Sequence, residues 1–206
     1  MFIKQQQPKV AVDERKQDRD IETLKKQLNN PDPKVRRWAA RDLVQYNEAS
    51  VALADQLLKE KEASVREVII SSLIKIADEA AITVLVECLR SDDAFLRNEA
   101  IEALKQLPNE VAPHIERLLK DKDKDIRIFT VNILESMRHP NVIKWLIDVI
   151  TNDPDVNVCS TALDLLCEVA NEDAIPAIVG LKERFKDEPY IIFTADMALK
   201  SLQGST

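Results

Sequence analysis

A block of twelve residues recurs six times along this chain of 206 residues, and this repetition restricts the possible folds more than any other feature. Each block has an acid in its first place, an aliphatic residue in its fourth, a small or aliphatic residue in its eighth and leucine in its twelfth. Successive fourth-place residues lie 30 to 33 residues apart. The blocks begin at Asp32, Glu62, Asp93, Asp123, Asp155 and Glu188. Self-similarity with such a period is typical of folds built by stacking small units.

The apolar positions predict that each block is a helix. Within a block they recur at i, i+4 and i+8, which places them on one helical face. A second periodic run lies between blocks, as in "AITVLVECL" from Ala81 to Leu89. We name the block helix the B helix and the other the A helix. The chain has only two glycines, whereas tight β-hairpins normally need more. An all-α chain is therefore expected, with about six A–B hairpins that each bury their faces against neighbours.

The repeat divides the chain into one domain and a tail. Residues 1–17 contain a glutamine run and a lone proline, so a mobile tail is expected there. The remaining residues 18–203 form a single repeat domain. Its expected units are 18–46, 47–77, 78–107, 108–138, 139–170 and 171–203.

Charge and composition exclude several classes of protein. The net charge is −7, with +4 in residues 1–46 and −11 in the remainder. An acidic body argues against a general nucleic-acid binder, which needs a basic surface. No apolar run approaches the roughly 18 residues of a membrane span, so no membrane insertion is expected. The three cysteines have no CxxC spacing, which favours reduced, buried thiols and a cytoplasmic location.

The acid-x-x-aliphatic-Arg block and its period resemble those of short, bacterial-type HEAT-like repeats, and the resemblance covers residues 19–203. Tetratricopeptide repeats need a 34-residue period and a Trp-Leu-Gly-Tyr pattern that is absent, and armadillo units carry a third helix. The resemblance implies a right-handed α-solenoid, an α–α superhelix whose B helices line the concave surface.

Four blocks carry arginine in the fifth place, four residues after the block's acid. Such acid–arginine pairs at i, i+4 are favourable on a helix. The resemblance also implies that these residues form a ladder between neighbouring repeats, so a structural role is expected. The ladder ends in the last two units, where Cys159 and Ile192 replace arginine. Its expected members are Asp32, Arg36, Glu62, Arg66, Asp93, Arg97, Asp123 and Arg127.

The sequence contains no motif that indicates catalysis. It lacks G-x-S-x-G, Walker and G-x-G-x-x-G patterns. The two histidines, His114 and His139, are too few for the paired His-Glu iron site of one enzyme of this repeat class. No catalytic residue, metal ligand or cofactor is therefore expected.

The exposed side of the B helices is the expected binding surface. Large apolar groups at surface positions indicate partner sites, and Trp, Tyr and Arg are frequent interface anchors. The alternative is that Trp38 and Phe129 pack into neighbouring repeats and that Phe193 belongs to a terminal cap. The candidate partner-binding residues are Arg37, Trp38, Arg41, Phe95, Ile128, Phe129, Tyr190 and Phe193.

Two functions remain open. The first is a non-enzymatic scaffold or adaptor that binds another protein or a peptide along the concave B-helix surface. The second follows from a resemblance to phycobilin-lyase subunits, which handle open-chain tetrapyrroles. Arg37, Trp38 and Arg41 would then hold the pigment, with Cys159 or Cys167 as a transient thiol site. The sequence indicates no oligomeric state.

Overall fold

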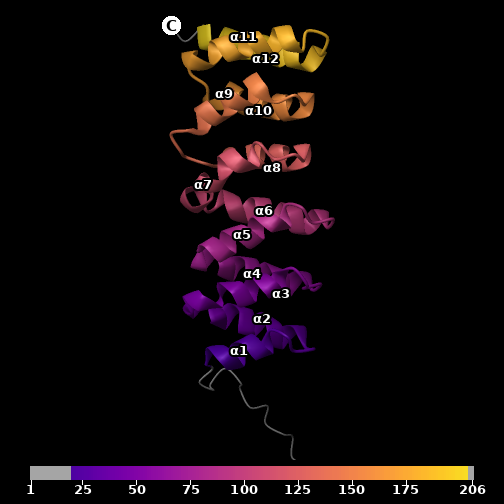
Figure 1. Ribbon diagram of the computed structural model, residues 1–206, viewed down its shortest axis with the longest axis vertical. Helices are drawn as coiled ribbons and strands as arrows, with labels where there is room; N and C mark the ends of the chain where they lie inside the picture. The colour runs from indigo at the N-terminus through magenta and orange to yellow at the C-terminus, as the bar shows by residue number, and fades with distance from the viewer. Residues whose placement is uncertain (1–19, 204–206) are drawn as a thin grey trace, which may run out of the picture.

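The computed structural model describes residues 20–203, which form twelve α-helices arranged as six stacked hairpins (Figure 1). This confirms the predicted all-α solenoid. The tail expected over residues 1–17 lies outside the described residues. The A helices are α1 (Ile21–Gln27), α3 (Ser50–Leu57), α5 (Glu79–Cys88), α7 (Pro108–Leu118), α9 (Val142–Asn152) and α11 (Ile175–Arg184). The B helices are α2 (Pro33–Asp42), α4 (Ala63–Ile76), α6 (Ala94–Lys105), α8 (Lys124–Leu134), α10 (Val156–Val169) and α12 (Pro189–Gln203).

The B helices form one continuous layer, because each packs against the B helix of the next hairpin from α2 to α12. The eighth-place residues of the blocks explain this close packing. They are small or aliphatic and all buried: Ala39, Ile69, Ala100, Thr130, Ala162 and Ala195. The twelfth-place leucines of the first five blocks are also fully or almost fully buried, whereas Leu199 in the last block is half-buried. The last unit therefore has a more accessible core edge, because no hairpin follows it within the described residues.

The acid that opens a block is the N-cap of its B helix. The side chains of Asp32, Asp93, Asp123 and Asp155 each accept a hydrogen bond from a backbone N–H in the first turn. Such caps satisfy N–H groups that have no partner inside the helix. Glu62 occupies the same place before α4 but makes no side-chain cap bond.

The connection from α4 to α5 contains an unusual backbone conformation. Ala77 ends α4 with φ 52° and ψ 30°, in the left-handed region, and its N–H bonds the carbonyl of Leu73. Asp78 then caps α5 by accepting the N–H of Ala81. The left-handed residue lets the chain reverse direction in a very short connection.

None of the helices formed by residues 20–203 combines the length and the apolar character that a bilayer crossing requires.

Candidate functional site

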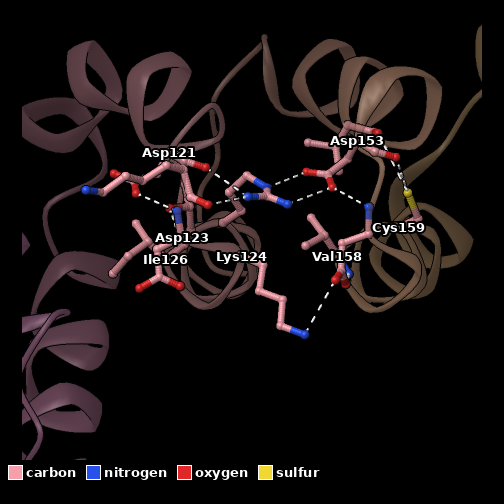
Figure 2. A network of polar contacts seen from close by, with 12 residues as sticks. Asp121, Asp123, Lys124, Ile126, Asp153, Val158 and Cys159 are labelled. Carbon is pink, nitrogen blue, oxygen red and sulfur yellow. Dashed lines mark hydrogen bonds and ion pairs between the residues drawn. The ribbon is translucent and has the colours of Figure 1, made fainter.

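Arg127 on α8 joins two neighbouring units through a nearly buried ion pair with Asp153. Figure 2 labels Asp153 and Asp121, which lie on either side of this contact. The Nε and Nη2 of Arg127 donate to the two carboxylate oxygens of Asp153, over 2.6 and 3.0 Å. Its Nη1 donates to the carbonyl oxygen of Asp121 in its own unit, over 2.9 Å. Asp153 also accepts the backbone N–H of Asp155, which caps α10. One guanidinium thus fixes α8 to the turn that starts the next B helix.

Arg36 on α2 repeats this arrangement in the first unit of the stack. Its Nε and Nη2 donate to the two carboxylate oxygens of Glu60, each over 2.7 Å, and its Nη1 donates to the carbonyl of Asn30. Burial alone would raise the pKa of Glu60. Hydrogen bonds from Arg36, the backbone N–H of Glu62 and Gln56 outweigh burial and lower this pKa to about 2.

The expected pairing of each arginine with the acid of its own block is wrong. Arg66 pairs with Asp93 of the next unit, and Arg36 and Arg127 pair with acids that precede the next block. Within residues 20–203, Arg97 forms no ion pair. It donates to the carbonyl of Ser91 over 2.7 Å and lies 5.9 Å from the ring centre of Phe129.

The physical reason lies at the helix N-termini. The carboxylates of Asp32, Asp93 and Asp123 bond N–H groups of their own first turns. Arg36, Arg66 and Arg127 instead turn toward the next unit, where a further acid is in reach. Arginine–acid pairs therefore connect neighbouring repeats, but among residues 20–203 only Asp93 of the four expected acids is an arginine partner.

Sequence reasoning missed the residue two places before each block. In five units its side chain accepts the backbone N–H of the block's first residue, over 2.8 to 3.1 Å. The sequence does mark this position, because in these five units it holds either a short side chain with an oxygen acceptor or glutamate. These residues are Asn30, Glu60, Ser91, Asp121 and Asp153.

Cys159 occupies the arginine place in the fifth unit, and the cation there comes from a different helix. Arg184, at the end of α11, donates to the carbonyls of Ile150 and Thr151. Its Nη2 lies 3.2 Å from the sulfur of Cys159. The junction between the last two units is therefore held by an arginine of the last A helix.

The predicted partner-binding residues differ in exposure. Phe95, Tyr190 and Phe193 are 55%, 54% and 66% exposed, and Arg37 and Arg41 are exposed. Trp38, Ile128 and Phe129 are half-buried, and the last two pack against the core. The set is not gathered in one place, because α2 and α12 lie at opposite ends of the stack (Figure 1).

Three hollows line the outer surface of the B helices, which we name the B face. They lie between α4 and α6, between α6 and α8, and between α8 and α10, with volumes of about 380, 250 and 230 Å³. Adjacent hollows share lining residues: Glu102 belongs to the first two, and Asn132 and Glu135 to the last two. The B face thus carries a row of three adjoining hollows across four helices, which together we name the furrow.

The cysteines offer no activated nucleophile. Cys88 and Cys159 are buried, and burial raises their pKa values to about 12 and about 11. The expectation of three buried thiols is wrong for Cys167, which is exposed at the end of α10. In the part of the chain that the structure describes, no three His, Cys, Asp or Glu side chains gather as metal ligands.

The comparison with protein families agrees with this architecture. A family model of HEAT repeats matches residues 21–105 and 111–203. No curated protein sequence matches the chain. Similar solved structures include an engineered protein, 22% identical with a TM-score of 0.45, covering 90% of this chain and 97% of its own. A designed armadillo repeat protein is 18% identical, with a TM-score of 0.43 and coverages of 89% and 100%.

The complex of CpcE and CpcF of phycocyanin lyase from Nostoc sp. is also among the matched structures. It is 16% identical, with a TM-score of 0.38, and the match covers 98% of this chain and 100% of that one.

Proposed function

Because this chain belongs to the family of HEAT repeat proteins, we propose that it is a non-enzymatic scaffold whose partner protein lies along the B face. The observation that carries the proposal is the combination of features on this face. Exposed aromatic side chains and a furrow occur on the same layer of helices. Apolar surface that remains in water beside a concave region is typical of sites that another protein covers.

The described residues also support a binding role in preference to a chemical one. The thiols of Cys88 and Cys159 have raised pKa values. The arginines Arg36, Arg66 and Arg127 are already used in contacts between units. The three cysteines are free, which suits a reducing compartment such as the cytoplasm.

The tetrapyrrole alternative requires residues that lie apart. Arg37, Trp38 and Arg41 are on α2, whereas Cys159 and Cys167 are on α10, four hairpins further along the stack (Figure 1). Cys159 is also fully buried. One pigment could not contact both groups at once, so this candidate has no specific support from the geometry.

The proposal is tested by partner capture with matched variants. Phe193→Ser removes an exposed apolar group from the B face, whereas Val51→Ser removes one that is 59% exposed on helix α3. Native lysate is passed over each immobilised variant, and bound proteins are quantified by mass spectrometry. We expect a protein captured by wild type to be lost with Phe193→Ser and kept with Val51→Ser. Equal retention by both variants, or loss with Val51→Ser alone, would contradict a partner on the B face.

A further inference from the structure

The furrow on the B face is strongly acidic. Six carboxylates and two lysines line its three hollows, and one of these lysines, Lys105, already pairs with Glu102 and Glu135 over 3.2 and 3.0 Å. This leaves Lys75 as the cation without an ion pair among the lining residues that the structure describes. The carboxylates are Glu67, Glu99, Glu102, Glu135, Asp164 and Glu168.

One oxygen of these carboxylates lacks a hydrogen-bond partner among the described residues. Oε2 of Glu99 is buried and accepts no hydrogen bond from any described residue. Burial raises the pKa of Glu99, and the nearby carboxylates of Glu67 and Asp93 raise it further, against the influence of Arg66. A buried acceptor without a donor is costly, so a cationic or N–H donor from outside would be favourable here.

An apolar stripe continues the furrow on α12. Tyr190, Phe193 and Met197 follow one another at i, i+3 and i+7, on one face of the helix, and each is more than half exposed. The hydroxyl of Tyr190 donates to Asp164 of the furrow over 2.8 Å. The stripe is therefore attached directly to the acidic end of the furrow.

We propose that furrow and stripe together bind one cationic, amphipathic segment of a partner protein. Apolar side chains of this segment cover Phe193 and Met197 on α12, while its lysines and arginines lie over the carboxylates from α10 back to α4. Charge complementarity selects this occupant, because an acidic segment would meet carboxylates with few cations to balance them. This inference rests on the proposed function. It adds the chemistry of the partner segment and the direction in which that segment lies across the helices.

The probe is a synthetic peptide of about fifteen residues with leucine and phenylalanine at one end and lysines spaced along the rest. Its binding to the full chain is measured by fluorescence anisotropy at low and moderate salt. We expect binding that weakens with salt, and no binding of a matched peptide with every lysine replaced by glutamate. Equal binding of both peptides, or none of the lysine peptide, would overturn the proposal.

Variants locate the site. Glu67→Lys and Glu168→Lys reverse charges in the furrow, and Glu87→Lys makes the same change on α5 as a control. The two furrow variants, and separately Phe193→Ser, should weaken peptide binding about tenfold or more, whereas Glu87→Lys should change it less than twofold. Equal weakening by Glu87→Lys would mean attraction to the overall negative charge, and the furrow would not be the site.

Cys167 gives a second readout that does not depend on substitution. Cys167 is an exposed residue, and its sulfur lies 3.9 Å from the carbonyl oxygen of Thr194, between α10 and α12. Bound peptide should slow its alkylation by iodoacetamide several-fold, while the buried thiols react slowly throughout. If saturating peptide left the alkylation rate unchanged, the peptide would not cover the end of the furrow beside α12.

One outcome separates this inference from the proposed function. A captured partner that is lost with Phe193→Ser but is not displaced by the lysine peptide would leave the scaffold function intact and refute the cationic segment.

Discussion

Arg127 and Arg97 occupy the same place in neighbouring blocks but contact different groups. Arg127 shares a bidentate pair with the buried Asp153, whereas Arg97 contacts a carbonyl and the ring of Phe129. The cost of removing each side chain therefore depends on what it leaves behind. A buried carboxylate without its cation is far more costly than a carbonyl that water can reach.

Arg127→Ala should lower the free energy of unfolding by about 3–5 kcal/mol. Arg97→Ala should lower it by about 1–2 kcal/mol, from one hydrogen bond and one cation–π contact. Urea unfolding followed by circular dichroism measures both. Equal losses would mean that the ion pair with Asp153 does not stabilise the junction between the fourth and fifth units.

The low pKa of Glu60 in the folded chain predicts a specific loss of stability in acid. Its pKa falls from 4.5 to about 2 on folding, so its carboxylate binds fewer protons in the folded chain. The associated stability is fully present above pH 4.5 and is lost as the pH falls toward 2. It amounts to about 3 kcal/mol at neutral pH. Unfolding free energies measured from pH 7 to pH 3 should fall less steeply for Glu60→Gln than for wild type. Parallel curves would contradict the role of Arg36 and Glu60.

At the scale of the helices, Ala77 and Gly180 are residues that do not suit the backbone conformations at their positions. Ala77 adopts the left-handed conformation at the end of α4, where glycine has no steric cost. Gly180 lies inside α11, where alanine is the better helix former. Both conflicts concern local backbone energy and leave the packing of neighbouring units unchanged.

Ala77→Gly should raise the free energy of unfolding by about 1 kcal/mol, because it removes the clash of the β-carbon in the left-handed region. The measurement is the same urea titration, with wild type alongside. A loss of stability would show that the flexibility gained by the unfolded chain outweighs this relief.

Gly180→Ala should also stabilise, by about 0.5–1 kcal/mol. A β-carbon added at Gly180 would meet no atom within 4 Å, so no packing cost opposes the better helix propensity. A decrease in the melting temperature would mean that this stretch of α11 has a constraint beyond helix propensity.

The helices were predictable from the sequence because the information is local. The period of the apolar residues and the capping acids lie within single blocks, and the structure confirms the solenoid they predict. The ladder partners were not predictable, because Glu60 and Asp153 lie outside the block and 24 or 26 residues from their arginines. Which acid an arginine meets depends on how successive hairpins stack, and the spacing of 30 to 33 residues leaves that open.

At the scale of the whole molecule, the candidate partner-binding residues are spread along the stack from α2 to α12. Exposure depended on tertiary packing, so the sequence could name Phe95, Tyr190 and Phe193 but could not separate them from the half-buried Trp38 and Phe129. The acidic furrow could not be predicted from the sequence, because its lining residues come from four helices that only the stacking of hairpins brings together. In a repeat fold the units stack in one row, so binding along one layer can engage several units at once.

The central claim is that a partner covers the B face of this solenoid. Hydrogen–deuterium exchange of the protein, alone and with a captured partner, tests it most directly, because each helix is followed separately. We predict that slower exchange on binding will concentrate in α4, α6, α8, α10 and α12. Slower exchange confined to α3, α5, α7, α9 and α11, with the B helices unchanged, would contradict the claim.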